Sequence, residues 1–152
     1  MEKLPAVESA KELMTEAVGW SVMKWLRQKR TVRQIADQAN AALDQLNREV
    51  KERWSADFKV AYETLLGQGA HTMKPPGKNA RATDSQVILS VRRIKAADEE
   101  AYRARMDAEE SFDIAEKQLS TALAREGCRK AIRSWELHEK AIRIAEALIA
   151  SH

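Results

Sequence analysis

The sequence contains few of the residues that interrupt helices, glycine and proline, and few cysteines that could form disulfides. Its 152 residues include five glycines, three prolines and one cysteine, Cys128. A single cysteine excludes an intrachain disulfide, and it suits the reducing cytoplasm, where we expect the protein to reside. Three of the glycines and two of the prolines fall between residues 67 and 83. We therefore expect a flexible loop at 67–83 with long helices on both sides of it.

Long apolar runs are also missing. A membrane-spanning helix needs ~18–20 consecutive apolar residues. The longest candidate, from Ala17 to Leu26, is interrupted by Ser21 and Lys24. The first residues, MEKLPAVESAKELM, lack the apolar centre and the cleavage site of a signal peptide. The sequence thus predicts neither a transmembrane segment nor a secretory leader.

Alanine, by contrast, is abundant. The chain has 25 alanines but only eight aromatic residues, and hydrophobic residues make up 44% of it against 32% charged ones. This balance is typical of a globular protein rather than a disordered one. Because alanine has the highest helix propensity, the composition favours slender, closely packed helices. The length suits one domain, so we expect residues 1–152 to form a single helical unit.

Apolar residues recur at steps of three and four in long stripes, which is the pattern of amphipathic helices. Three capping-box pairs mark possible helix starts: Ser9 with Glu12, Thr31 with Gln34, and Thr83 with Gln86. Together these signals predict helices at 9–29, 32–66, 84–126 and 129–150. The fold expected is all-α, an elongated antiparallel bundle of four helices with coiled-coil packing. If the joints at Arg30–Thr31 and Gly127 are continuous, the alternative is a long hairpin of two helices.

Antiparallel pairing about the central loop fixes a register. Residues that face each other should have numbers that sum to roughly 149, so that Asp98, Glu99 and Glu100 lie opposite Arg48, Lys51 and Arg53. The same register brings two clusters of cations to one end of the bundle. This basic end is a candidate anion-binding surface made of Lys24, Arg27, Lys29, Arg30, Arg33, Arg129, Lys130 and Arg133.

Two tryptophans raise the question of a second subunit. Trp20 and Trp25 lie five residues apart, so on a helix they point ~140° from each other. One neighbouring helix cannot bury both. We therefore expect Trp20 or Trp25 at the interface of a homodimer, the commonest closed oligomer.

Catalytic and metal-binding motifs are not indicated. The Glu-x-x-His pattern of di-iron bundles precedes none of the three histidines, and we expect no cofactor. His138 falls on the seam of the last helix, where it is either a core residue or a ligand. Cys128 lies ten residues from it, about 15 Å along a helix, which is too far to share one metal ion.

These observations favour a non-enzymatic helical module that acts through protein–protein contacts and self-associates. The alternative, from a different class, is a protein that binds nucleic acid or another anionic surface through the basic end. A small-molecule site near Trp135 and His138 is a third class, and it would need a polar cavity.

Overall fold

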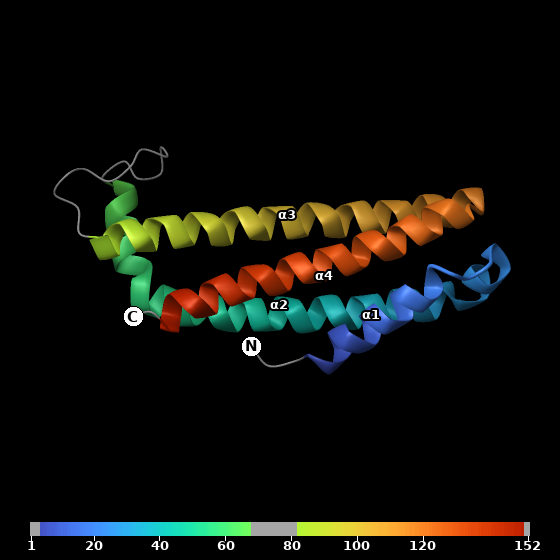
Figure 1. Ribbon diagram of the computed structural model, residues 1–152, viewed down its shortest axis with the longest axis horizontal. Helices are drawn as coiled ribbons and strands as arrows, with labels where there is room; N and C mark the ends of the chain where they lie inside the picture. The colour runs from blue at the N-terminus through green and yellow to red at the C-terminus, as the bar shows by residue number, and fades with distance from the viewer. Residues whose placement is uncertain (1–3, 68–81, 151–152) are drawn as a thin grey trace.

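The computed structural model describes the backbone of residues 4–67 and 82–150, and the side chains of residues 4–53 and 89–150. Within these ranges the chain forms four α-helices and no strand: α1 (Pro5–Ala17), α2 (Val22–Gly67), α3 (Ala82–Gln118) and α4 (Thr121–Ala150). They lie along one long axis (Figure 1). The all-α, elongated four-helix fold is thus confirmed. The loop expected at 67–83 falls largely outside the described residues.

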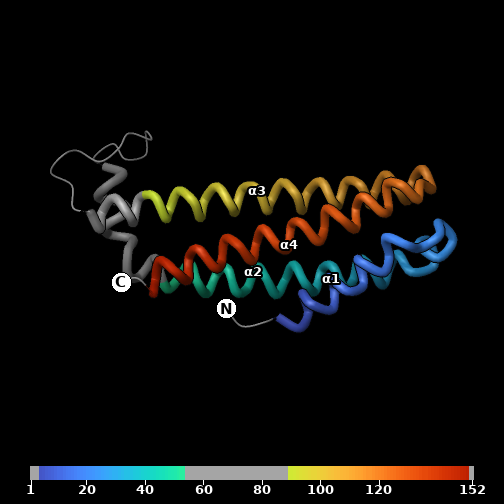
Figure 2. Tube along the Cα trace, in the orientation of Figure 1, coloured from blue at the N-terminus to red at the C-terminus, as the bar shows by residue number. Residues whose placement is uncertain are grey.

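Helix α4 is the centre of the bundle. It packs along α3 for most of its length and also contacts α2 and α1, whereas α2 and α3 barely contact each other. Figure 2 shows α4 running between α3 and α2, with α1 against the first half of α2. Within the described part of the chain, no helix is long and apolar enough to cross a membrane.

The first predicted helix boundary is wrong. Helix α2 runs without interruption through Arg30 and Thr31, and the break lies at residues 18–21 instead. There the Ser21 hydroxyl accepts a hydrogen bond from the Lys24 backbone N–H at 3.2 Å, which caps α2. The capping-box pair Thr31–Gln34 therefore lies inside a helix. It is a chance match.

The second predicted boundary is also wrong, because Gly127 lies within α4 and the chain turns at Leu119 and Ser120. Leu119 adopts a left-handed conformation with φ 53°, and the Ser120 N–H bonds the Ala115 carbonyl at 3.1 Å. This pattern ends a helix in the way a C-terminal glycine usually does. Since the described chain breaks at both 18–21 and 119–120, the two-helix hairpin is excluded.

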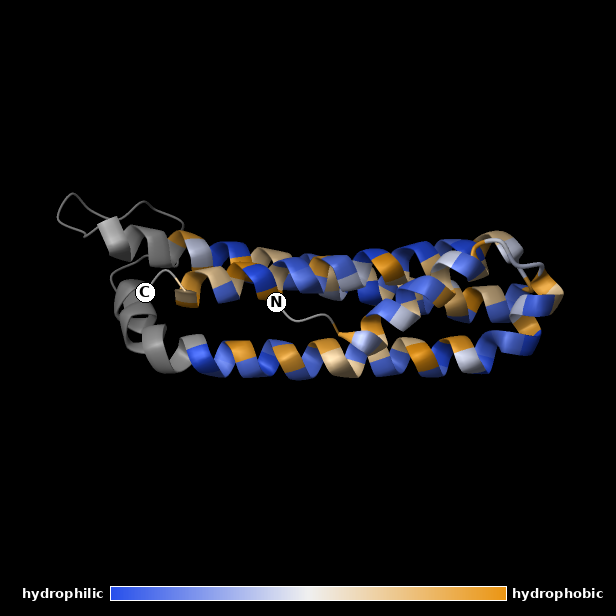
Figure 3. Cartoon of the chain, turned by 60° about the horizontal axis from the view of Figure 1, so that its bottom comes forward, coloured by the Kyte–Doolittle hydropathy of each residue, from blue (hydrophilic) through white to orange (hydrophobic). Residues whose placement is uncertain are grey.

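The apolar stripes form the core as predicted. Figure 3 shows hydrophobic and hydrophilic residues alternating along each helix, and the hydrophobic ones turn inward. The seam of α4 is buried through Ala131, Trp135, Ile142 and Ala145. The α3 stripe is buried at Val91, Ile94, Ala97, Ala101, Ala108, Phe112 and Ala115.

Candidate functional site

Both candidate interface tryptophans are buried within the single chain. Trp25 is 2% exposed and Trp20 is 8% exposed. The Trp25 ring stacks on Phe112 of α3, with ring centroids 5.3 Å apart, while Lys24 Nζ lies 5.0 Å from the centroid of the Trp20 ring. Trp20 lies in the turn at 18–21 and Trp25 lies in α2, so the two side chains do not project from one straight helix. The single chain therefore buries both without a second subunit.

The basic end exists, but the fold neutralises part of it. Residues 24–33 lie in the first part of α2 and residues 129–133 in the first half of α4, so both clusters lie in the half of the bundle that carries the turns at 18–21 and 119–120 (Figure 1). The acidic second half of α3 ends there too. Four of the eight cations have carboxylate partners within the chain: Lys24 with Glu16, Arg33 with Asp113 and Glu116, Lys130 with Glu126, and Arg133 with Glu100.

The predicted register between α2 and α3 is confirmed by ion pairs. Among the described side chains, Lys51 Nζ lies 2.7 Å from Asp98 Oδ2, and Arg105 Nη1 lies 3.1 Å from Asp44 Oδ2. Arg33 Nε lies 2.7 Å from Glu116 Oε1. The residue numbers sum to 149 in each of these pairs. Glu100 departs from the expectation, because it pairs with Arg133 of α4.

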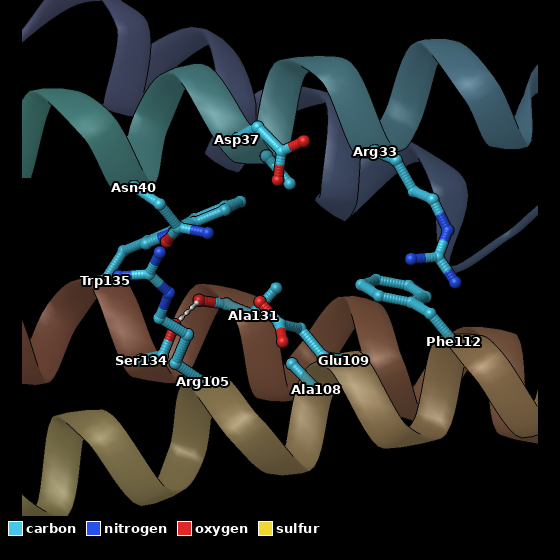
Figure 4. Close-up of a pocket in the computed structure, with 11 residues that line it drawn as sticks. Arg33, Asp37, Asn40, Arg105, Ala108, Glu109, Phe112, Ala131, Ser134 and Trp135 are labelled. Atoms are coloured by element: carbon cyan, nitrogen blue, oxygen red, sulfur yellow. Dashed lines mark hydrogen bonds between the residues drawn. The ribbon is translucent and has the colours of Figure 1, made fainter.

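Between these ion pairs, α2 and α3 stand apart and leave a cavity of about 90 Å³ whose floor is α4. Trp135 and Ser134 line it from α4, and Asn40 lines it from α2 (Figure 4). Phe112 closes it from α3. The charged lining residues are Arg33, Asp37, Arg105 and Glu109.

A buried hydrogen bond fixes the polar wall of this cavity. Trp135 Nε1 donates to Asn40 Oδ1 at 2.8 Å. Because an indole N–H can only donate, the amide oxygen must face Trp135, and the amide nitrogen of Asn40 must face away from it. Figure 4 shows that nitrogen directed toward the cavity. Asn40 is only 7% exposed, and its amide nitrogen is the part that remains accessible, so it can donate to water or to a bound molecule in the cavity.

His138 lies one turn further along α4, in the core rather than on the surface. Its Nε2 atom is buried and has no hydrogen-bond partner among the described residues. Burial is the main reason that the pKa of His138 is lowered, and the charges of Asp44, Arg105, Asp98 and Lys51 also act on it. The imidazole is therefore neutral at pH 7. This arrangement matches the core alternative for His138.

Cys128 is a second buried titratable group. Burial raises the pKa of its thiol to about 12, so that little thiolate is present near neutral pH. Among the described residues, no group of three or more His, Cys, Asp or Glu side chains is placed to hold a metal ion.

Asn40 and Asp37 were not among the candidate residues predicted from the sequence. A signal for Asn40 was available, because it follows Ala39 and precedes Leu43 on the apolar stripe of its helix. A polar amide at the edge of a buried face usually has a specific hydrogen-bond partner. For Asp37 no such signal exists, since exposed carboxylates are common on any helix. The sequence does place Glu109 on one helix face with Asp113 and Glu116, a face that could hold a cation, but it favours a solvated acidic surface there.

Comparison with known proteins finds no match: no protein family, no curated protein and no solved structure resembles this chain at a significant level.

Proposed function

We propose that this chain is a non-enzymatic helical module that acts through protein–protein contacts and pairs with a second copy of itself. The observation that carries the proposal is an apolar pair near the middle of α3. Tyr102 is 61% exposed and Met106 is 44% exposed, and they lie one turn apart on the same face. Large apolar side chains that share an exposed face are typical of contact surfaces.

Helix α3 is covered mainly by one neighbour, α4. It packs on α4 along one side and makes few contacts with α2, so its opposite face is left to solvent. A second copy of α3, packed antiparallel, brings the cations at residues 92–95 opposite Asp113 and Glu116 of its partner. The acids Asp98 and Glu99 then face Glu110 and Glu109, so the apolar pair rather than the charge pattern carries the contact.

A two-fold axis between Tyr102 and Met106 satisfies both features. Antiparallel packing of two α3 helices sets Tyr102 of each chain beside Met106 of the other. The same operation places Lys95 opposite Asp113. Apolar contact at the centre with opposite charges toward the ends is the usual anatomy of a symmetric interface.

The buried thiol of Cys128 supports two further parts of the proposal, the absence of catalysis and a location in the cytoplasm. A thiol with its pKa raised to about 12 is a poor nucleophile, which fits a protein without covalent catalysis. A lone free cysteine also suits a reducing compartment, so we propose that the module works in the cytoplasm.

The dimer is tested by light scattering coupled to size exclusion. The unmodified protein should have twice the mass of one chain at micromolar concentration. The double variant Tyr102→Glu/Met106→Glu should be monomeric, because four carboxylates would meet at the two-fold axis. Met23→Glu is the matched control: Met23 is 63% exposed on α2, away from this face, and its variant should remain dimeric. A monomeric unmodified protein, or a dimer that tolerates the double variant, would contradict the proposal.

A second function, binding of nucleic acid or another anionic surface, is favoured by one observation on α4. A shallow hollow of about 580 Å³ there is lined by four cations and one acid. The lining residues are Ala122, Arg125, Glu126, Arg129, Lys130 and Arg133. Phosphate contacts by such cations make binding strongly dependent on salt.

If this second function holds, purified protein should retain nucleic acid at low salt, seen as a raised ratio of absorbance at 260 nm to that at 280 nm. Replacing Arg125 and Arg129 with glutamine should reduce retention and flatten its salt dependence. The matched control replaces Arg48 and Arg53, two exposed arginines of α2 outside the basic end, with glutamine and should leave retention unchanged. If the unmodified protein at low salt has an absorbance ratio near that of pure protein, this function is eliminated.

A further inference from the structure

The cavity between α2, α3 and α4 has two carboxylates that the fold does not use. Asp37 projects toward it from α2 and Glu109 from α3 (Figure 4). Neither has an ion-pair or hydrogen-bond partner among the described side chains. The two guanidinium groups at the cavity, in contrast, are engaged: Arg33 pairs with Asp113 and Glu116, and Arg105 pairs with Asp44.

The charge around the cavity is therefore negative. Counting the charged lining residues and the partners of the two arginines, five carboxylates surround two guanidinium groups. A small cation that enters the cavity would gain from this imbalance, because the walls exclude part of the solvent that screens charges in water.

The remaining walls suit an organic cation rather than a metal ion. The aromatic rings of Trp135 and Phe112 line the cavity together with Ala36, Ala108 and Ala131. Aromatic faces attract ammonium groups and cover the methylene groups that carry them. The amide nitrogen of Asn40 faces the cavity without a partner among the described residues, so it can donate to a hydrogen-bond acceptor on the same ligand.

We propose that this cavity binds a small organic amine that carries a hydrogen-bond acceptor a few bonds from its ammonium group. The ammonium group lies between Asp37 and Glu109, and the acceptor receives the Asn40 N–H. The volume of about 90 Å³ is over half of the ~150 Å³ that holds benzene in an engineered cavity, so a ligand of about four non-hydrogen atoms fits.

Ethanolamine is the probe that meets these requirements. Titrated into ¹⁵N-labelled protein, it should shift the assigned indole N–H resonance of Trp135 and the side-chain amide resonances of Asn40, with saturation in roughly the millimolar range expected for so few atoms. 1-Propanol, which lacks the ammonium group, and propionate, which reverses the charge, should give no saturable shift. Propylamine, which lacks the acceptor, should bind more weakly than ethanolamine.

Variants of the two lining carboxylates distinguish binding in the cavity from non-specific binding to the protein surface. Asp37→Asn combined with Glu109→Gln should weaken ethanolamine binding about tenfold, the loss expected for a charge-assisted hydrogen bond. Both residues are exposed and unpaired among the described side chains, so the fold should tolerate the changes. Glu110→Gln, a neighbouring exposed carboxylate outside the cavity lining, should leave the affinity unchanged. The proposal is overturned if ethanolamine gives no saturable shift, or if the double variant binds it as tightly as the unmodified protein.

Discussion

Trp135→Ala should lower the free energy of unfolding by about 3–5 kcal/mol, the range for removing a buried large aromatic. Trp135 is 1% exposed and lies where α4 meets α2 and the cavity. Its loss enlarges that cavity and also leaves Asn40 Oδ1 without its donor. The second effect adds the cost of an unsatisfied buried acceptor to the cost of the lost packing. Urea unfolding followed by circular dichroism measures the change.

Two further variants separate these contributions. Trp135→Phe keeps most of the ring and removes the indole N–H, so it should cost about 1–3 kcal/mol, mainly through the orphaned amide oxygen. Met23→Ala, at a 63% exposed position, should stay within about 0.5 kcal/mol of the unmodified protein. An unchanged midpoint for Trp135→Ala would show that the α4 seam is not buried in solution.

The sequence predicted the register of α2 against α3 more accurately than the ends of the helices. Register depends on where the hairpin turns and on the spacing of opposite charges, and both can be read along one chain. The pairs Lys51–Asp98 and Asp44–Arg105 have the predicted sum of residue numbers. Glu100 did not pair with a cation of α2, because Arg133 of α4 lies close enough to reach its carboxylate. Competition for a charge by a third helix depends on tertiary packing.

The helix breaks were missed for different physical reasons. At residues 18–21 the signal was present, since Gly19 and Ser21 are a usual helix end and helix cap, but the apolar run across them favoured continuity. At residues 119–120 a cap was present, since the Ser120 hydroxyl accepts from the Leu123 N–H at 3.2 Å, but the stop was disguised. A leucine with φ 53° and a side chain 58% exposed occupies a conformation that glycine or asparagine normally adopts.

The cavity could not be predicted from the sequence. It exists because α4 separates α2 from α3, and the periodicity of single helices does not determine how far apart two helices lie. Trp135 was predicted to be buried and is, yet its partner Asn40 belongs to a helix 95 residues away in sequence. The burial of Trp20 and Trp25 within one chain could not be predicted either, because it depends on tertiary contacts such as the stacking of Trp25 on Phe112 of α3.

Gly127 shows most clearly how packing reverses a sequence-based expectation. Glycine inside a helix costs about 1 kcal/mol relative to alanine, so sequence alone predicts that Gly127→Ala stabilises the protein. In the structure, a Cβ atom at this position would lie 2.7 Å from Phe112 Cδ1 and 2.8 Å from Phe112 Cε1. The ring cannot retreat easily, because its other face stacks on Trp25. Gly127 is therefore the contact that lets α4 approach α3.

We expect Gly127→Val to lower the free energy of unfolding by about 2–3 kcal/mol, because its branched side chain overpacks against Phe112 and displaces the stacked rings. Gly127→Ala should destabilise by less, with the opposite sign to its helix propensity. Adding Phe112→Leu to Gly127→Val should recover part of the loss, since a smaller side chain leaves room for the new atoms. Urea unfolding of the unmodified protein, the two single variants and the double variant measures this coupling. If Gly127→Ala raises the midpoint, α3 and α4 lie further apart in solution than this packing requires.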